Sequence, residues 1–336
     1  MDKEHFGLDK VVYDFFGKQE YSTKVISSGQ VNNNYLVQFN GEKFVVRETS
    51  KPERNIVFES EIIKRLREKK FPTPRLLRTT KNKRFSYNNE NKKKYQAFSY
   101  VEGKVLDDNE VADHLLLTIG ESLGNMHNAL ENFMPKEKPL FEGFGHFQNI
   151  SDRINAIPYI QNEILARFSL EQPKRKAIIT LCEKTANEIE RDIRRVIKGL
   201  PVQPIHGDYT RENILFNSDI SEIAGVIDFD DAHMDPRIFD PVIASVYFGT
   251  NEREFSTKKV KKIFEGYRYA IATPLQSKEA TAIQSLTEMY GLFAVFWTIN
   301  KFNQSQNFED LGKVLKYSSI LESIRDTNVE TWRNLI

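Results

Sequence analysis

The sequence predicts an α+β fold in two lobes, a small strand-rich N-terminal lobe and a larger helical C-terminal lobe. Three observations predict this class. Short apolar runs separated by Gly, Asn and Pro fill residues 1–100, a pattern typical of strands and turns. Most of the chain after residue 103 has the longer periodicity of amphipathic helices. Two short strands with acidic and amide residues at their ends interrupt this helical region. The predicted boundary divides the chain into residues 1–101 and 102–336.

The N-terminal lobe begins with three consecutive strands. We predict them over residues 24–27, 35–39 and 43–47, and the pair Asn40-Gly41 between the last two is a strong signal for a two-residue hairpin turn. Residues 55–70 form an amphipathic helix that ends before Pro72 and Pro74. A further hairpin is expected from strands at 75–80 and 95–100, with a turn region rich in Lys and Asn between them.

The C-terminal lobe is expected to consist mainly of long helices, because apolar residues recur there every three to four positions. The predicted helices cover residues 109–131, 151–168, 173–198, 257–272, 278–303 and 308–325.

The interruption in the helical lobe carries the most informative pattern of the chain. Asp208 opens a D-x-x-x-x-N string that ends at Asn213, and two apolar strands joined by a polar turn follow, ending at Asp228. A hairpin centred near Ile220 and Ser221 would place Asn213 and Asp228 side by side, about 4.8 Å apart. Their oxygen atoms suit Mg²⁺, and a carboxylate at Asp208 can accept a hydroxyl proton. This is the order of parts in kinase-type phosphoryl transfer.

Phosphoryl transfer also needs groups that hold the nucleotide. The loop of residues 27–34 has one glycine, Gly29, and its Ser28, Asn32 and Asn33 side chains can donate hydrogen bonds to phosphates. Arg47 on the third strand is the candidate cation for the phosphates, because its guanidinium can bind them bidentately. Lys43 lies on the same face of that strand. The following helix offers two carboxylates as partners for the cation, at positions 59 and 61.

Four segments resemble one family of small-molecule kinases. They are residues 205–215 (IHGDYTRENIL), 225–240 (GVIDFDDAHMDPRIFD), 58–77 with the Pro72-Thr73-Pro74 step, and 119–127 ending in Met-His. This set is similar to the aminoglycoside phosphotransferase and choline kinase-like family, whose fold is protein-kinase-like. The resemblance runs from about Gly29 to Asp240. Within the family, residues 29–36 (GQVNNNYL) are most similar to the loop of type II homoserine kinases.

The resemblance implies roles for individual residues. Asp208 would be the catalytic base, and Asn213 and Asp228 the Mg²⁺ ligands. Arg47 stands at the phosphate-gripping position, which holds Lys in many relatives and Arg in others, and Glu59 stands at the position of its ion-pair partner.

The same comparison implies supporting roles elsewhere. Residues 98–101, which include Ser99 and Val101, match the hinge whose backbone bonds the adenine edge. Asp240 matches a buried aspartate that steadies the catalytic loop, while His127 and His206 match structural positions. A nucleotide would bind between the lobes.

Composition excludes several classes of function. The 48 basic and 47 acidic residues nearly cancel, so no bulk charge attracts nucleic acid or a membrane. A single cysteine, Cys182, excludes an internal disulfide, and the charged N-terminus shows no signal peptide. The longest apolar run is shorter than the roughly 20 residues that span a bilayer. We therefore expect a cytoplasmic protein, and the sequence does not specify its oligomeric state.

The sequence therefore predicts a phosphotransferase that uses ATP, or GTP as the alternative, with Mg²⁺ and a small molecule bearing a hydroxyl. Homoserine or another amino alcohol, a sugar, choline and an aminoglycoside all stay open as acceptors. Acidic residues of the C-terminal helices could line a pocket for a polycation or be solvated, namely Glu288, Glu309 and Glu322. Three cations could instead meet a substrate carboxylate, namely Arg211, Arg237 and Arg268.

Three other functions were weighed. An inactive nucleotide-binding scaffold would lack one of Asp208, Asn213 and Asp228, and all three are present. A kinase acting on protein would carry an A-P-E element after Asp228, and none follows. A metal-dependent hydrolase would leave the Gly29 loop and the Arg47 and Glu59 pair without a role.

Overall fold

The computed structural model describes residues 8–17, 20–28, 33–107, 110–141, 152, 172–305 and 307–333. The chain forms two compact units, each considered separately below. The first comprises residues 1–105, 133–141 and 213–232, and the second comprises 106–132, 142–212 and 233–336. The hairpin between residues 213 and 232 therefore groups with the N-terminal sheet, and the lobe boundary after Val101 stays a prediction.

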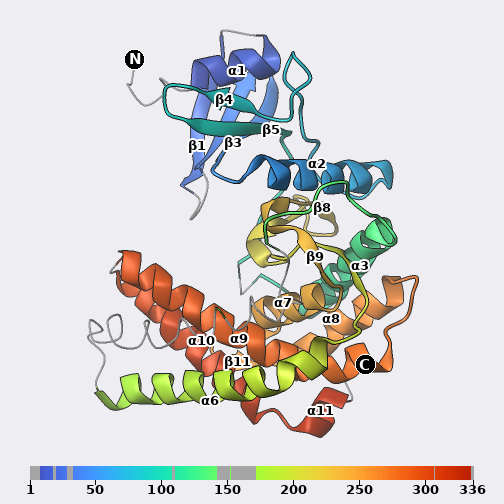
Figure 1. Ribbon diagram of the computed structural model, residues 1–336, viewed down its shortest axis with the longest axis vertical. Helices are drawn as coiled ribbons and strands as arrows, with labels where there is room; N and C mark the ends of the chain where they lie inside the picture. The colour runs from blue at the N-terminus through green and yellow to red at the C-terminus, as the bar shows by residue number, and fades with distance from the viewer. Residues whose placement is uncertain are drawn as a thin grey trace. The chain divides into compact units, whose positions relative to one another are not determined.

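The first unit is built on a five-stranded antiparallel sheet with the strand order β1-β2-β3-β5-β4 (Figure 1). Its strands are β1 (Ser22–Ser28), β2 (Asn33–Phe39), β3 (Glu42–Thr49), β4 (Ser86–Asn88) and β5 (Lys93–Ser99). The predicted turn between β2 and β3 is present, with positive φ at both Asn40 (50°) and Gly41 (79°). This register pairs Arg47 of β3 with Gln96 of β5.

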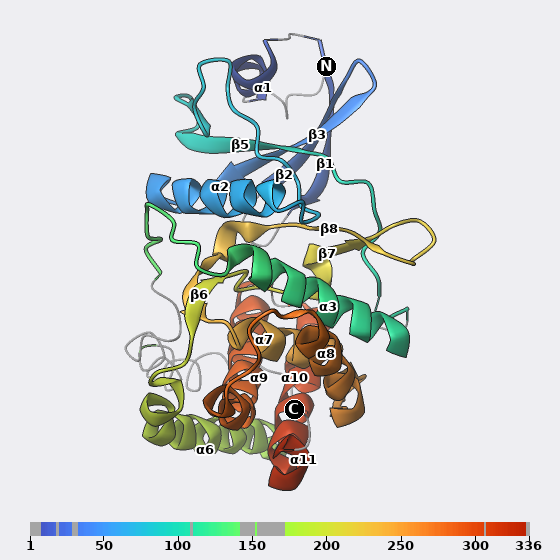
Figure 2. The same ribbon diagram turned by 90° about the vertical axis from the view of Figure 1, so that its right-hand side faces the viewer.

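A helix that the sequence analysis missed, α1 (Leu8–Phe16), packs on this sheet. Its buried residues Leu8, Val11, Val12 and Phe15 join a core that includes the sheet residues Val37, Val46, Tyr95 and Ala97. Figures 1 and 2 both show α1 beside the sheet. Nine residues give only two turns, too few to establish a helical period in a region where strands dominate.

The segment after β3 agrees with prediction in its helix but not in its next strand. The helix α2 (Glu53–Glu68) matches the predicted one within two residues, and Ile56, Ile62, Ile63 and Leu66 are buried. The strand predicted at 75–80 is wrong: this segment makes one isolated bridge, from Leu76 to Phe98. In place of the predicted strand, β4 pairs with β5 at this edge of the sheet. β4 lies within the Lys-rich region that was predicted as a turn.

The predicted site hairpin is present as β7 (Ile214–Phe216) and β8 (Ile223–Val226), with a register that differs from prediction by one residue. Ile214 pairs with Val226, so Asn213 lies opposite Ile227, whose N–H donates to its carbonyl at 2.9 Å. The turn is centred between Asp219 and Ile220, one residue earlier than predicted, and the irregularity between Leu215 and Phe216 offsets part of this displacement. Asp228 follows one residue later in the left-handed conformation (φ 61°), so the chain turns sharply at this carboxylate.

The second unit is mainly helical, as predicted. The predicted boundaries agree within one to four residues for α3 (Asp113–Leu130), α6 (Gln172–Ile197), α8 (Thr257–Ala270), α9 (Ser277–Ser305) and α10 (Phe308–Asp326). Apart from residue 152, the helix predicted at 151–168 lies outside the described residues. The structure also has elements that were not predicted, namely β6 (Val202–Ile205), β9 (His233–Pro236), the short pair β10 (Thr250–Asn251) and β11 (Glu254–Phe255), α7 (Phe239–Phe248) and α11 (Val329–Arg333). The antiparallel pair β6–β9 and the buried helix α7 flank the catalytic segment along the chain.

Helices α3 and α8 pack through glycines and lie side by side in Figures 1 and 2. A Cβ atom on Gly120 would lie 2.1 Å from the carbonyl oxygen of Ile263, and one on Gly266 would lie 2.1 Å from that of Leu117. The two backbones therefore approach too closely for any side chain at either position. This contact supports the helix that carries His127.

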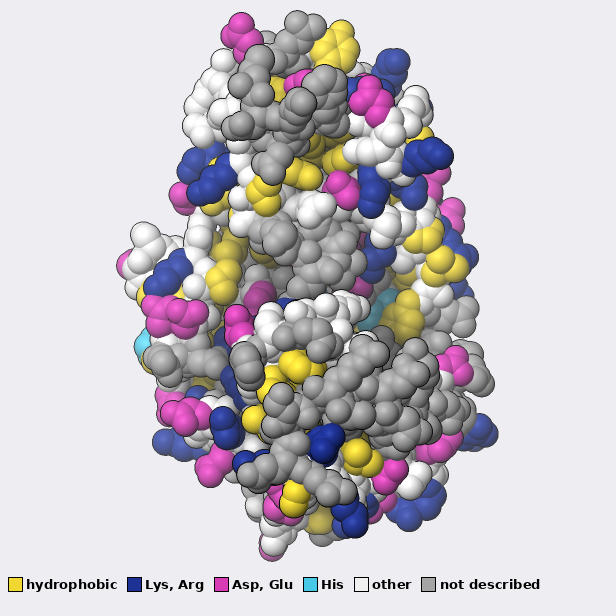
Figure 3. All heavy atoms as spheres, turned by 90° about the vertical axis from the view of Figure 1, so that its left-hand side faces the viewer, with side chains coloured by type: hydrophobic (Ala, Val, Ile, Leu, Met, Phe, Trp, Pro, Cys, Tyr) yellow, Lys and Arg dark blue, Asp and Glu magenta, His cyan; other side chains and the backbone are white. Residues whose placement is uncertain are grey.

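Among the described helices, none is long and apolar enough to cross a membrane. Figure 3 shows basic and acidic side chains interspersed over the described part of the face that it presents. This mixture agrees with a formal net charge of +1.

We expect Gly120→Ala to destabilise the protein by at least about 2 kcal/mol, because the added methyl group overlaps a backbone carbonyl that cannot rotate away. The matched control is Gly312→Ala on α10, where a Cβ atom meets nothing within 4 Å. Alanine favours a helix over glycine by roughly 1 kcal/mol, so the control should be neutral or stabilising. Urea denaturation of both variants measures the difference, and equal midpoints would contradict the close packing of α3 and α8.

Candidate active site

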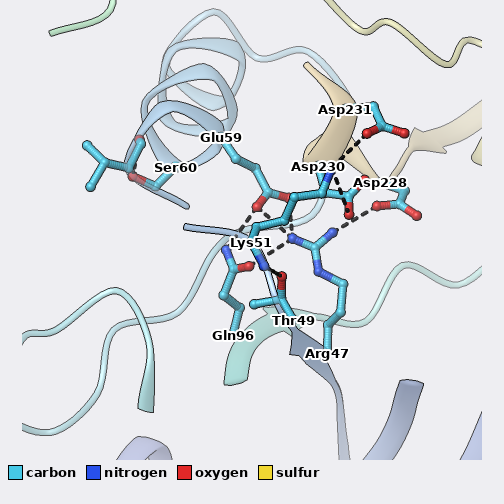
Figure 4. Close-up of polar contacts among 10 residues, drawn as sticks. Arg47, Thr49, Lys51, Glu59, Ser60, Gln96, Asp228, Asp230 and Asp231 are labelled. Carbon is cyan, nitrogen blue, oxygen red and sulfur yellow. Dashed lines mark hydrogen bonds and ion pairs between the residues drawn. The ribbon is translucent and has the colours of Figure 1, made fainter. Parts of the chain in front are cut away.

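A buried guanidinium forms the centre of the first unit's polar cluster (Figure 4). Arg47 comes from β3, and its side chain is 5% exposed. Its Nη2 donates to both carboxylate oxygens of Glu59 on α2 at 2.6 Å. Its Nη1 donates to Asp228 Oδ1 at 2.8 Å. Burial alone would lower the pKa of Arg47, but the nearby charges of Glu59 and Asp228 raise it, so the side chain stays cationic.

The structure settles which glutamate faces this cation. Glu59 is buried against Arg47, whereas Glu61 points elsewhere and accepts a hydrogen bond from the backbone N–H of Lys136 at 2.7 Å. Lys43 likewise lies away from the cluster and pairs with Glu102 at 3.3 Å.

Gln96 completes the cluster, and sequence reasoning missed it. Its Nε2 donates to Glu59 at 2.9 Å, and its Oε1 accepts from Arg47 at 2.9 Å. Phe98 of the same strand lies under the guanidinium, 4.9 Å from its centre to the ring centroid. The β3–β5 register was the available signal, because it pairs Gln96 with Arg47.

One donor of Arg47 remains unused. Its Nε is buried and has no hydrogen-bond partner among the described residues. An unsatisfied buried donor costs about 1–3 kcal/mol, so such a group usually has a functional explanation. A phosphate oxygen beside the Nε and Nη edge of the guanidinium would satisfy it, since this edge matches phosphate geometry.

Asp228 and Asn213 have the chemistry of a Mg²⁺ site. The Asp228 side chain is 40% exposed, and of the described residues only Arg47 bonds its carboxylate, at Oδ1. Its Oδ2 is therefore available to a cation. Asn213 is buried and supplies an amide oxygen at the start of β7. The described residues contain no group of three or more His, Cys, Asp or Glu that could hold a metal. Mg²⁺ needs no such cage, because it typically takes one or two carboxylates plus phosphates and water.

A second cation contacts the same acidic turn, η4 (Phe229–Asp231). Lys51, two residues after β3, lies 2.8 Å from Asp231 Oδ1 and 3.9 Å from Asp230 Oδ2. Burial and the charge of Asp228 raise the pKa of Asp230. Arg47 and Lys51 therefore hold three neighbouring carboxylates in place, and no sequence pattern marks Lys51 for this role.

The predicted hinge follows β5, and its backbone groups differ in availability. The N–H of Ser99 donates to the carbonyl of Arg75 at 2.9 Å, and that of Tyr100 to the carbonyl of Lys43 at 3.3 Å. No described residue bonds the N–H of Val101. Among these three residues, Val101 is therefore the one whose backbone N–H has no described partner. The phosphate loop is not placed: Gly29 and Asn32 lie outside the described residues, as does the side chain of Ser28.

In the second unit, a buried carboxylate holds the segment before Asp208. Asp240 of α7 accepts from the backbone N–H groups of His206 and Gly207 at 2.8 and 2.9 Å. His127 Nε2 lies 3.0 Å from Asp240 Oδ2, and its Nδ1 lies 2.8 Å from the hydroxyl of Tyr267. Burial would raise the pKa of Asp240, but the hydrogen bond and charge of His127 lower it. An ionised Asp240 accepts from His127 Nε2–H, and the hydroxyl of Tyr267 contacts the other ring nitrogen, Nδ1.

The surroundings of Asp208 carry both signs of charge and an aromatic pair. The rings of Tyr247 (α7) and Tyr317 (α10) lie 6.0 Å apart. Burial raises the pKa of Tyr317 to about 12, with further effects from Arg211, Glu212 and Asp208. Burial also raises the pKa of Tyr247, and Asp208 adds to that rise. Both tyrosines therefore keep their protons, and neither had a sequence signal.

Lys316 belongs to the same group of side chains. Its ammonium lies 6.0 Å from the ring centroid of Tyr317. Burial lowers the pKa of Lys316, and the charge of Arg211 lowers it further. These two cations therefore lie near each other beside the aromatic pair.

Most of the charged residues suggested for the acceptor do not gather near Asp208. Glu288 pairs with Arg325 at 3.5 Å, Glu309 is 78% exposed and pairs with Lys313, and Glu322 is exposed. Arg237 is buried against Glu279 at 2.9 Å, and Arg268 is exposed. Of the three arginines, only Arg211 interacts electrostatically with the two tyrosines that Asp208 also affects.

A sheet of this topology, a helical region and this site define a phosphotransferase of the protein-kinase-like fold. The chain belongs to the phosphotransferase enzyme family, whose model matches residues 22–269. It is therefore a small-molecule phosphotransferase. No curated protein sequence matches the chain.

Solved structures confirm the predicted fold. The microcompartment-associated aminopropanol kinase is 14% identical, with 98% of each chain covered and a TM-score of 0.74. Amicoumacin kinase hAmiN, in complex with AMP-PNP, Ca²⁺ and Ami, is 13% identical, with 97% of this chain and 94% of that chain covered and a TM-score of 0.70. An aminoglycoside phosphotransferase from Alicyclobacillus acidocaldarius is also 13% identical, with the same coverage and a TM-score of 0.65.

Glu59→Ala should lower the free energy of unfolding by about 3–5 kcal/mol, because it leaves the Arg47 charge buried with one partner fewer. Glu68→Ala is the control on the same helix: its pair with Lys64 is exposed at 3.7 Å and should contribute about 0–1 kcal/mol. Urea denaturation at pH 7 compares them. A Glu59→Ala loss no larger than that of Glu68→Ala would show that the cluster does not stabilise the fold.

Asp240→Asn should make the free energy of unfolding depend less on pH in the acid range. The pKa of Asp240 is lowered in the folded protein, so its stabilisation is present above the ordinary value of 3.8 and is lost as the pH falls through the folded-state pKa. Asparagine does not titrate. The unfolding free energies of wild type and variant should differ by about 1–3 kcal/mol at pH 7 and converge below pH of about 4. Parallel profiles would mean that Asp240 does not carry its charge in the folded protein.

Proposed function

We propose that the protein transfers the γ-phosphate of ATP, with GTP as the alternative donor, to a hydroxyl group of a small molecule. The observation that carries this proposal is the buried guanidinium of Arg47. Two carboxylates from different elements fix it, and its Nε–H has no partner. A fixed cation with a spare donor suits a phosphate chain, because its charge and its N–H group are already positioned for phosphate oxygens.

Each residue then has a defined task. Arg47 binds phosphate oxygens, and Glu59 with Gln96 fixes the plane of its guanidinium. Asp228 Oδ2 and the side-chain oxygen of Asn213 would hold Mg²⁺, which when bound neutralises charge on the phosphates. Asp208 orients the acceptor hydroxyl and accepts its proton as the oxygen attacks the γ-phosphorus and the bond to the leaving ADP breaks.

For the acceptor, we favour a small molecule with an amine and a carboxylate or another anion. Asp208 and Glu212 supply negative charge beside the Tyr247–Tyr317 pair, and Arg211 and Lys316 supply positive charge. Aromatic faces and carboxylates bind ammonium groups, and cations bind carboxylates. This arrangement suits homoserine or a related amino alcohol better than a polycationic aminoglycoside, since Glu288, Glu309 and Glu322 do not gather there. The fold shared with an aminopropanol kinase is consistent with an amino alcohol.

A coupled ADP-release assay tests the proposal directly. The acceptor series is homoserine, aminopropanol, choline, glucose and kanamycin, each with Mg²⁺ and either ATP or GTP. Turnover of at least one member above the hydrolysis background is the expected result. Acceptor-independent hydrolysis alone, or turnover of protein substrates only, would contradict it.

Asp208→Ala should reduce kcat by at least about 10²-fold, in line with the contribution of a positioned base, while ADP affinity stays near that of the wild type. Asp219→Ala is the control, because Asp219 is exposed in the β7–β8 turn. Steady-state kinetics and ADP titration measure the two quantities. Normal turnover by Asp208→Ala would remove this carboxylate from the reaction.

A further inference from the structure

A second basic site lies on the outer side of α2, in the first unit. A cavity of about 250 Å³ is lined by five cations from three segments, namely Lys64, Arg65, Arg78, Arg84 and Lys136. Two carboxylates also line it. Glu68 pairs with Lys64 at 3.7 Å, and Glu61 accepts the backbone N–H of Lys136 at 2.7 Å. The cavity therefore has a clear excess of positive charge.

Two of these arginines, Arg78 and Arg84, line the cavity from one segment of the chain. Burial and the charge of Arg84 lower the pKa of Arg78, so the two guanidiniums repel each other across the cavity. Neither makes an ion pair with a described carboxylate. Arg84 Nε donates to Ser60 Oγ at 2.8 Å, and Arg78 Nη1 makes a long contact of 3.4 Å with the carbonyl of Asn82. Like charges near each other are unfavourable, and an anion bound between them would offset the repulsion.

The side chains that line the cavity indicate which class of anion it would bind. Guanidinium groups bind phosphate through paired N–H donors, and two of them can bind one phosphate dianion together. Phe133 and Met134 supply an apolar edge, and Met134 is 70% exposed. An exposed thioether beside a basic cavity suits the carbon body of an organic phosphate. The volume suits the phosphate end of a small ligand.

We propose that this cavity binds a phosphate-bearing anion, held by Arg78 and Arg84 against α2. It is separate from the Arg47 cluster yet adjoins it along the helix. Ser60, which accepts from Arg84, follows Glu59, which accepts from Arg47 (Figure 4). An anion at this site would therefore contact the helix that positions Glu59, the ion-pair partner of Arg47.

Isothermal titration tests the site in the full-length protein. Inorganic phosphate and glycerol 3-phosphate are the two probes, each at ionic strength matched with sodium chloride. Arg78→Gln should weaken binding of the effective probe at least about 10-fold, since it removes a charged hydrogen-bond donor worth roughly 1.5–3 kcal/mol. Arg84→Gln should do the same. Arg54→Gln, on the exposed first turn of the same helix and outside the cavity, should bind like the wild type.

The outcomes separate an organic phosphate from the free phosphate ion, and this binding site from the proposed kinase activity. Tighter binding of glycerol 3-phosphate than of inorganic phosphate identifies the ligand as an organic phosphate, and equal binding of the two identifies it as the free ion. No heat beyond the chloride control, or equal affinity in wild type and Arg78→Gln, would overturn the proposal. The assay needs neither ATP nor turnover, so an absence of kinase activity would refute the proposed function and leave this result readable. Phosphate that binds at Arg47 would bind Arg78→Gln with the affinity of the wild type, which distinguishes it from phosphate in this cavity.

Discussion

The burial of one positive charge in the N-terminal sheet constrains the rest of the first unit. Arg47 cannot leave the sheet, because it sits in mid-strand on β3 with its side chain pointing into the packed face against α2. A buried guanidinium is tolerated only when it is paired and hydrogen-bonded. Its partners come from α2, from β5 and from the turn after β8. Four segments far apart in sequence are thereby fixed around a single group.

Such a cluster contributes more to the choice of one folded arrangement than to the free energy of unfolding. Replacing a buried ion pair with apolar side chains is often neutral or stabilising, so the cluster's retention calls for another reason. The spare Nε donor supplies one, because it faces no described acceptor. The second unit uses the same principle. There the buried carboxylate of Asp240 fixes the two amides before Asp208, and the chain from Tyr267 through His127 fixes Asp240. In the first unit Glu59 and Asp228 position Arg47, which keeps one donor without a described partner. In the second unit His127 positions Asp240, which holds the backbone amides before Asp208.

The sequence predicted the secondary structure around these two centres, because the elements that carry their residues are marked by order and spacing. The D-x-x-x-x-N string, the apolar strands after it and the helix after β3 are local patterns, and the structure has the hairpin and α2 at the expected places. What sequence reasoning missed depends on contacts between distant segments. Gln96, Lys51 and the tyrosines at 247 and 317 are ordinary residues until the fold brings them beside a charge. The one-residue difference in the β7–β8 register arises because the turn lies one residue earlier than predicted, and a register shift between Leu215 and Phe216 offsets only part of that displacement. The short helix α1 was missed because two turns carry too little periodicity.

The claim that Arg47 binds nucleotide phosphate is tested most directly by comparing ADP with adenosine. Titrations of both ligands, with Mg²⁺, into the wild type and Arg47→Met separate phosphate contacts from base contacts. Adenosine is the internal control, because it reports whether the nucleotide site remains folded. We expect the wild type to prefer ADP and the variant to lose at least about 10-fold of this preference at unchanged adenosine affinity, as expected for a charged hydrogen bond. An ADP preference that survives in Arg47→Met would show that Arg47 does not bind the nucleotide phosphates.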